Sequence, residues 1–233
     1  MVNIRCTAVF MDIEGTTSAA RHIFEVFFPY SRSRMRSWVE ENGTEPATAA
    51  ALQEVADSLG TSTSDTDAIV RQLTDWIDAD VKSAPLKTLQ GLIWEGGYDS
   101  GELTAHMFDD VPPAMEAWRT AGLDLYIYSS GSVAAQKGIF GHAPQGDLTP
   151  LITGYFDITT AGPKREPASY RNMARAIGAA PTDLLFLSDV QAELDAAREA
   201  GWQVVGLLRE GESQATATGD PHVASFSDIH ITP

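Results

Sequence analysis

The most reactive pattern in the sequence is a set of carboxylates that follow short apolar runs. Asp12 and Glu14 come directly after the run at residues 7–11, and Asp189 follows the run at residues 184–187. Two carboxylates from different strands repel each other unless a cation lies between them, and a hard ion such as Mg²⁺ prefers oxygen ligands. A carboxylate can also attack phosphorus, while a second one protonates the leaving oxygen and later activates water. Asp12 and Asp189 are therefore a candidate metal pair, and the loop of Asp12 and Glu14 could supply both the nucleophile and the acid.

A second group of polar residues could bind a phosphate. Ser129, Ser130 and Gly131 follow another apolar run, and Lys164 lies in the segment AGPKRE. Serine hydroxyls and backbone amides donate hydrogen bonds to phosphate oxygens, and an ammonium group neutralises charge that builds up on them. These residues would complete a phosphoryl-transfer site.

Each of these features alone has a simpler explanation. The segment DIEG could be a turn, the run SSGS or the pair Ser188-Asp189 could cap a helix, and a lone Lys164 is usually a solvated surface charge. Their common place at predicted strand ends favours a functional site, because independent accidents would rarely align in this way.

The elements that must position these residues alternate between strands and helices. Apolar runs predict strands at residues 7–11, 123–128, 155–158, 184–187 and 204–208. Helical spacing predicts helices at residues 112–122, 169–177 and 192–200. Strands joined by single helices predict a Rossmann-like α/β fold with a parallel sheet, whose ligands lie beyond the carboxyl ends of the strands.

The stretch after the first strand is helical. We expect an α/β core of residues 1–17 and 111–233, with a helical cap inserted at 18–110. Pro29 should interrupt the helical pattern of residues 22–38, and the aromatic side chains of residues 24–30 should pack the insertion or face an apolar substrate tail. Segments rich in Ala, Thr and Ser are expected to be exposed segments or loops at residues 44–51 and 214–219.

Composition limits the classes of partner and compartment. The 233 residues include 16 Lys and Arg against 32 Asp and Glu, which gives a formal net charge of −16. This charge disfavours binding to nucleic acids or to anionic membranes. Cys6 is the single cysteine, which excludes an intramolecular disulfide and a multi-cysteine metal site. With no apolar run of about 18 residues, we expect a cytoplasmic protein.

The ordered motifs DIEGT, YSSGS, AGPKRE and LFLSDVQAELDAAREAG resemble those of the haloacid-dehalogenase superfamily of aspartate-nucleophile phosphatases. The superfamily usually has Asp two residues after the nucleophile, where this sequence has Glu14. Glu14, the following Thr16-Thr17 and the segments FFPYSR and YIYSSGSVAAQK are similar to the enolase-phosphatases (acireductone synthases) of methionine salvage. The resemblance covers nearly the whole chain.

The resemblance implies a role for each matched residue. Asp12 would be the nucleophile and an Mg²⁺ ligand, Glu14 the general acid and base with its backbone carbonyl on the metal, and Asp189 a further metal ligand. Ser129 and Ser130 would bind phosphate, and Lys164 would order the nucleophile and the phosphate.

The substrate implied by the resemblance is 2,3-diketo-5-methylthiopentyl-1-phosphate, a small phosphorylated diketone that is enolised and then dephosphorylated, and the expected form is a monomer. The enolisation base is left open between Glu14, a cap residue and a water molecule. The alternatives are a generic Mg²⁺-dependent phosphomonoesterase, a metal-independent dehalogenase of the same fold, and a catalytically silent Mg²⁺- or phosphate-binding regulator.

Overall fold

The computed structural model describes residues 1–81, 83–212 and 221–233, and it divides the chain into two compact units. We call Met1–His22 with Ala105–Pro233 the sheet unit, and Ile23–Thr104 the helical unit. Residues 18–22 and 105–110, which the sequence assigned to the insertion, thus group with the sheet unit. The reason is local hydrogen bonding, since the Gly15 N–H donates to the Ser18 carbonyl (2.7 Å) and the Phe108 N–H to the Thr17 carbonyl (3.0 Å).

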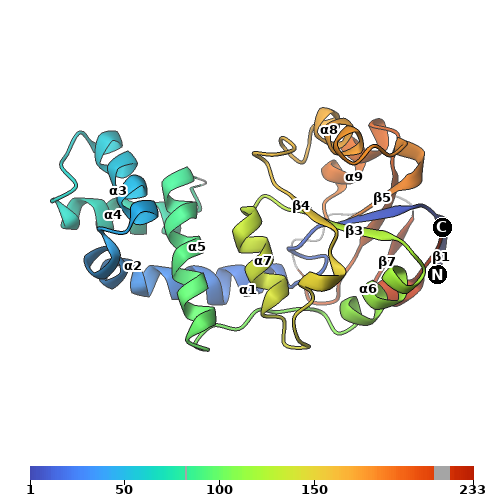
Figure 1. The fold of residues 1–233 in the computed structure, drawn as a ribbon, viewed down its shortest axis with the longest axis horizontal. Coiled ribbons are helices and arrows are strands. Elements are labelled where there is room, and N and C mark those ends of the chain that lie inside the picture. Colours follow the sequence, from blue (N-terminus) through green and yellow to red (C-terminus); the bar gives the residue numbers. More distant parts are fainter. Residues whose placement is uncertain (82, 213–220) are drawn as a thin grey trace. The chain divides into compact units, whose positions relative to one another are not determined.

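Within the described residues, six parallel strands form the sheet in the order β4-β3-β2-β5-β6-β7 (Figure 1). Their bounds are β2 Ala8–Met11, β3 Asp124–Tyr128, β4 Gly154–Phe156, β5 Leu184–Ser188, β6 Gln203–Leu207 and β7 His222–Val223. In the register, Met11 lies opposite both Ile127 and Leu187. The residues that follow β2 are therefore flanked by those that follow β3 and β5. This confirms the predicted parallel α/β fold.

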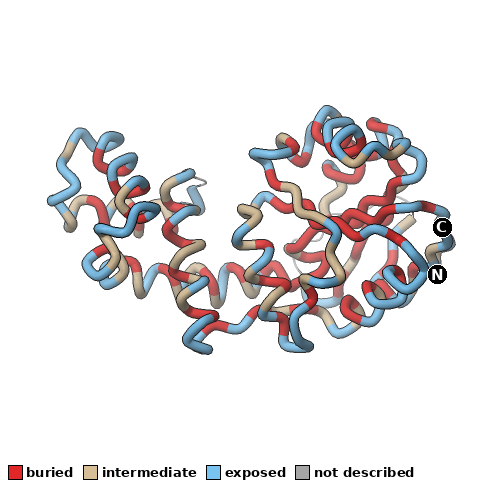
Figure 2. Tube along the Cα trace, viewed as in Figure 1, coloured by how far each residue is buried: buried red, intermediate tan, exposed pale blue. Residues whose placement is uncertain are grey.

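Helices cover both faces of this sheet. The sheet unit contains α1 Ala20–His22, α6 Val111–Thr120, α7 Val133–Gly141, α8 Pro167–Ile177 and α9 Gln191–Glu199, with short 3₁₀ turns at Thr149–Leu151, Pro181–Asp183 and Phe226–Asp228. Tyr170 of α8 and Leu194 of α9 pack with Phe10 and Phe186 in one buried cluster. Helix α6 lies on the opposite side of the sheet from α8 and α9 (Figure 1). Strands β2, β3, β5 and β6 are buried along nearly their whole length (Figure 2), as expected for a parallel sheet covered on both faces.

A second, two-stranded parallel sheet pairs β1 Val2–Arg5 with β8 Ile229–Thr232, so the two ends of the chain lie side by side (Figure 1). These strands were missed in the sequence. They are short and half-exposed, with polar residues such as Asn3 and His230 alternating with apolar ones. The apolar signal that identifies a fully buried strand is therefore weak here.

The helical unit comprises a π-helical turn at Ile23–Phe27 and helices α2 Phe28–Asn42, α3 Pro46–Leu59, α4 Thr66–Asp78 and α5 Ala84–Asp99. Its core is a cluster that includes Met35, Leu52, Leu73 and Leu89. Pro29 lies in the first turn of α2, directly after the π-helical turn. The hydrogen-bond pattern changes beside this proline, but the helical path continues.

Residues 44–47 are exposed, as expected, but the expectation of a loop at residues 44–51 is wrong from residue 46 onward. Helix α3 begins at Pro46, and Thr48 and Ala51 are buried in it. Alanine is the strongest helix former, so the Ala-rich composition favours this helix. The similar segment 214–219 lies outside the described residues.

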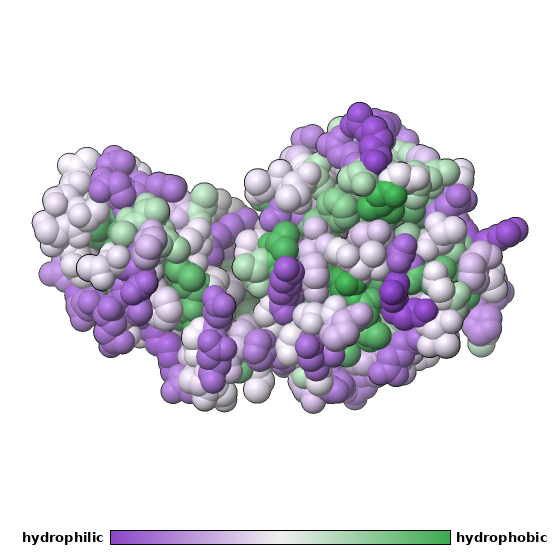
Figure 3. Space-filling model, in the orientation of Figure 1, coloured by the Kyte–Doolittle hydropathy of each residue, from purple (hydrophilic) through white to green (hydrophobic). Residues whose placement is uncertain are grey.

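The face of the molecule shown in Figure 3 carries mainly hydrophilic and neutral side chains, with hydrophobic ones in small patches. None of the helices in residues 1–81, 83–212 and 221–233 combines the length and the apolar composition that a bilayer-crossing helix needs.

Candidate active site

Asp12 is the first residue after the central strand β2, and it lies buried at the carboxyl end of the sheet. Its N–H donates to the Leu187 carbonyl of β5 (2.9 Å), which continues the ladder by one residue. Its Oδ1 accepts the N–H of Ile13 (2.7 Å), and its carbonyl accepts the hydroxyl of Thr17 (3.0 Å). The nucleophile candidate is thus fixed on both its side chain and its backbone.

The loop after Asp12 is a tight turn that passes against Asp189. Gly15 has φ +73°, in the left-handed region that favours glycine, and a Cβ at this position would collide with the Asp189 carboxylate. Asp189 follows β5 directly and is buried. The loop after Asp12 and the residue after β5 therefore lie against each other.

Lys164 joins two buried carboxylates. Its Nζ lies 2.6 Å from Asp12 Oδ1 and 2.7 Å from Glu193 Oε2. Ser188 donates to the same Glu193 oxygen (3.0 Å) and lies 3.4 Å from Asp12 Oδ2. Burial disfavours the ammonium form, but Asp12 and Glu193 outweigh it and raise the pKa of Lys164, so this side chain stays cationic.

The site holds more negative than positive charge. Burial raises the pKa of Asp12 well above its ordinary value, and Glu193, Glu14 and Asp189 add to the shift although Lys164 opposes it. Burial likewise raises the pKa of Asp189 to about 7, against the effect of Lys164. Four neighbouring carboxylates face one cation, so a further positive charge would balance the site. Hard oxygen ligands of this kind suit a divalent cation such as Mg²⁺.

The donor set limits how such a cation would be held. Among the residues that the structure describes, no three His, Cys, Asp or Glu side chains are grouped as a metal site. The ligand set expected from the sequence asks for less than this, namely the carboxylates of Asp12 and Asp189 and the backbone carbonyl of Glu14. Such an open set suits Mg²⁺, which keeps several water ligands and needs only one or two carboxylates.

The predicted phosphate-binding serines lie beside this cluster. Ser129 follows β3 and is buried, with its hydroxyl 3.5 Å from Glu14 Oε2 and accepting the N–H of Gly131 (3.1 Å). Ser130 is the next residue and is exposed. The helix-capping role considered for the SSGS run belongs to Ser132, whose hydroxyl accepts the Ala135 N–H at the start of α7 (3.2 Å).

Glu193 was missed as a site residue in the sequence. It lies four residues after Asp189, in the first turn of α9, and is buried. The sequence did carry a signal for Glu193, because this acidic residue lies on the buried face of a helix just after a strand-end aspartate. Glu is almost never fully buried unless it is paired, so the position indicated a partner.

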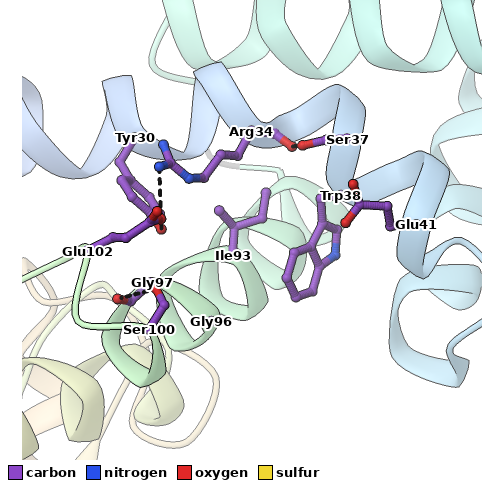
Figure 4. Close-up of a pocket in the computed structure, with 10 residues that line it drawn as sticks. All are labelled: Tyr30, Arg34, Ser37, Trp38, Glu41, Ile93, Gly96, Gly97, Ser100 and Glu102. Atoms are coloured by element: carbon purple, nitrogen blue, oxygen red, sulfur yellow. Dashed lines mark hydrogen bonds and ion pairs between the residues drawn. The ribbon is translucent and has the colours of Figure 1, made fainter.

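A cavity of about 230 Å³ opens within the helical unit, between α2 and α5 (Figure 4). The guanidinium of Arg34 stacks on the ring of Tyr30 (3.8 Å to its centroid) and pairs with Glu102 (2.9 Å), which also accepts the Tyr30 hydroxyl (3.0 Å). In this cavity the charge of Arg34 is paired with that of Glu102. The cavity therefore lacks the excess of carboxylates that the cluster in the sheet unit has.

Comparisons with known proteins agree with this geometry. Residues 6–201 match the family model of haloacid dehalogenase-like hydrolases. The chain is 50% identical over 226 residues to the enolase-phosphatase E1 of Streptomyces avermitilis, covering 96% of this chain and 95% of the relative. It is 50% identical over 224 residues to the enolase-phosphatase E1 of Pseudomonas aeruginosa, covering 96% and 98%.

Solved structures support the fold. The crystal structure of the UTR4 protein of Saccharomyces cerevisiae superposes with a TM-score of 0.80 at 32% identity, covering 95% of this chain and 99% of that one. The CbbY protein of Rhodobacter sphaeroides in complex with phosphate, at 15% identity and a TM-score of 0.59, shares the fold. The chain therefore belongs to the haloacid dehalogenase-like hydrolases and, among them, to the enolase-phosphatase E1 family.

Proposed function

We propose that the protein is an acireductone synthase of methionine salvage. It would convert 2,3-diketo-5-methylthiopentyl-1-phosphate, through its enol phosphate, to 1,2-dihydroxy-3-keto-5-methylthiopentene and phosphate. The observation that carries the phosphatase half is the contact of Lys164 Nζ with Asp12 Oδ1 at 2.6 Å, at the carboxyl end of the central strand. The family assignment supports the substrate.

In this proposal Asp12 attacks the phosphorus atom. The phosphoryl group moves from the substrate oxygen to an Asp12 carboxylate oxygen, and Glu14 gives its proton to the leaving oxygen. Glu14 then takes a proton from the water that hydrolyses the aspartyl phosphate, which restores both side chains. The Asp12 backbone is held by Leu187 and Thr17, so the attacking side chain starts from one orientation.

The phosphate itself would be bound by Ser129, Ser130 and Lys164. Lys164 offsets negative charge on the transferring group, and its pairing with Glu193 keeps the ammonium directed at Asp12. The carboxylates of Asp12 and Asp189 and the carbonyl of Glu14 would hold Mg²⁺, which supplies Lewis-acid polarisation of substrate oxygens. The excess of buried carboxylates supports this placement.

The helical unit would act as a cap that excludes water from the bound substrate. Of the aromatic segment expected at a substrate tail, Phe27 is buried within the unit and Phe24 is exposed, so Phe24 is the better candidate for that contact. The acidic composition and the single cysteine support a cytoplasmic enzyme, and we propose that it acts as a monomer.

The test compares phosphate release from the diketone phosphate with release from a panel of sugar phosphates, while enol absorbance is followed. The proposal expects a strong preference for the diketone phosphate, and enol absorbance that appears before or with phosphate. Equal rates across the panel without an enol signal would instead support a generic phosphomonoesterase. Asp12→Asn should lower phosphate release by more than ~10³-fold, since an amide is not a competent nucleophile.

A further inference from the structure

Arg209 lies two residues after β6 and is buried at the base of the loop that carries Asp12. Its Nε and Nη2 both donate to the Thr16 carbonyl (3.0 and 2.8 Å). Its Nη1 contacts both oxygens of Asp110 (2.8 and 2.7 Å), at the residue before α6. One planar side chain thus ties together two segments that are distant in the sequence.

The guanidinium is also held from its faces. Its central carbon lies 4.4 Å from the ring centroid of Phe108 and 5.0 Å from that of Phe226. Asp110 is fixed in turn, because its Oδ2 accepts the Ser225 hydroxyl (2.8 Å) and the Phe226 N–H (2.6 Å). This arrangement leaves the arginine fork little freedom, and a lysine could not reproduce it with a single ammonium group.

We call the contacts of Arg209 with Thr16 and Asp110 the clamp. One further residue, Thr17, connects the clamp to Asp12. Thr17 follows Thr16, whose carbonyl accepts the two hydrogen bonds from Arg209. The Thr17 hydroxyl donates to the Asp12 carbonyl (3.0 Å). The Thr17 carbonyl accepts the N–H of Phe108 (3.0 Å), whose ring covers Arg209. Thr16, Thr17 and Asp12 are therefore locked to one another and to the segment at Phe108–Asp110.

We propose that Arg209 is a positioning residue for the nucleophile, which it acts on by fixing the Thr16 carbonyl against Asp110. The inference rests on the proposed role of Asp12 but not on the identity of the substrate. Arg209 itself touches no reacting atom. Its loss should leave phosphate binding nearly intact and slow the chemical step, because a small displacement of a reacting group costs far more in rate than in binding.

The experiment uses Arg209→Lys, which keeps the positive charge and loses the fork. With the magnesium-supplemented enzyme, kcat for p-nitrophenyl phosphate and for the diketone phosphate should fall by ~10- to 100-fold, with KM changed by less than about threefold. Assays are run well below each variant's Tm, so that all the enzyme is folded. The matched control is Arg119→Lys, an exposed arginine of the same unit that binds Asp124 and the Leu123 carbonyl at the other end of the sheet. It should retain wild-type kcat.

Two further measurements distinguish a role of Arg209 in positioning Asp12 from a role in the stability of the fold alone. Thr17→Val keeps the side-chain shape and removes the hydroxyl that binds Asp12, so it should lower kcat in the same KM-independent way. Added guanidinium ion should restore part of the kcat of Arg209→Ala, and methylammonium should not. If Arg209→Ala does not fold, Arg209→Lys and Thr17→Val decide.

A fall in Tm with unchanged kcat in both of those variants would overturn the inference and leave Arg209 a purely structural residue. Failure of the wild-type enzyme on the diketone phosphate, with turnover of p-nitrophenyl phosphate, would overturn the proposed substrate. The clamp would then still be judged on the second substrate.

Discussion

The ammonium of Lys164 lies 2.6 Å from Asp12 and 2.7 Å from Glu193, so one buried cation is shared by two buried carboxylates. Removal of the shared cation leaves both carboxylates without their ionic partner. This loss should lower the free energy of unfolding as well as the catalytic rate, because an uncompensated buried charge is strongly unfavourable.

Lys164→Met is therefore expected to lower the free energy of unfolding by about 3–5 kcal/mol. The deficit should shrink as the pH is lowered, since burial raises the pKa of Asp12 and its protonation removes a charge that has lost its partner. Urea unfolding at pH 8 and pH 5 measures both effects. Arg171→Met, which breaks an exposed pair with Glu199 (3.8 Å), should cost less than about 1 kcal/mol. Equal losses in the two variants would contradict a stabilising role for the buried pair.

Glu14→Gln should lower kcat by ~10²- to 10⁴-fold, because a neutral amide can neither protonate the leaving oxygen nor activate water. The loss should be smaller for p-nitrophenyl phosphate, whose leaving group needs no proton, as long as breakdown of the phosphoenzyme is not rate-limiting. Steady-state and burst kinetics on both substrates measure this difference. An unchanged rate on the diketone phosphate would remove Glu14 from acid and base chemistry.

Ser129 and Ser132 form a matched pair of substitutions. Ser129→Ala should raise KM by ~10- to 100-fold, since a hydrogen bond to a charged phosphate contributes ~1.5–3 kcal/mol. Ser132→Ala should leave KM unchanged and cost ~1 kcal/mol of stability, because that hydroxyl caps α7. Substrate titrations and thermal melts on both variants distinguish the two roles, and the reverse pattern would exchange the assignments.

Asp189 gives the metal-free protein a defined dependence on pH. Burial raises its pKa from 3.8 to about 7, so between these values the native state holds a proton that the unfolded state has lost. The contribution of this group to the free energy of unfolding therefore falls as the pH rises from about 4 to about 7, by at most roughly 1.4 kcal/mol per pH unit. Asp189→Asn should remove this component from urea-unfolding data taken in EDTA.

The same reasoning predicts how the proposed Mg²⁺ would stabilise the protein. A metal ligand must be deprotonated, so Mg²⁺ should raise the Tm of the wild-type protein more at pH 8 than at pH 6. It should raise the Tm of the Asp189→Asn variant much less at either pH. A Tm shift that does not depend on pH or on Asp189 would place the metal elsewhere.

The sequence was most informative where a strand is fully buried. The run before Asp12 and the run before Asp189 are continuous and apolar, so the strands and their polar ends could be located without the structure. The parallel arrangement then brings those ends to one edge of the sheet, which is why Asp12, Lys164 and Asp189 could be grouped from spacing and order.

What the sequence did not reveal depends on contacts between distant segments. The burial of Glu193 is decided by its pairing with Lys164, and the place of Arg209 is decided by Thr16 and Asp110. Strand β1 is stabilised by pairing with the last strand of the chain, and its own residues carry little apolar signal. Such partners cannot be identified from one segment alone.

Gly15 has a consequence for how this loop can vary. Its backbone angle already disfavours every residue with a side chain, and a single methyl group there would take the space of the Asp189 carboxylate. The two penalties are independent, so a compensating change that relaxes one leaves the other in place. In a saturation library screened for phosphate release, codon 15 should tolerate no replacement, while an exposed position such as Arg21 should accept many.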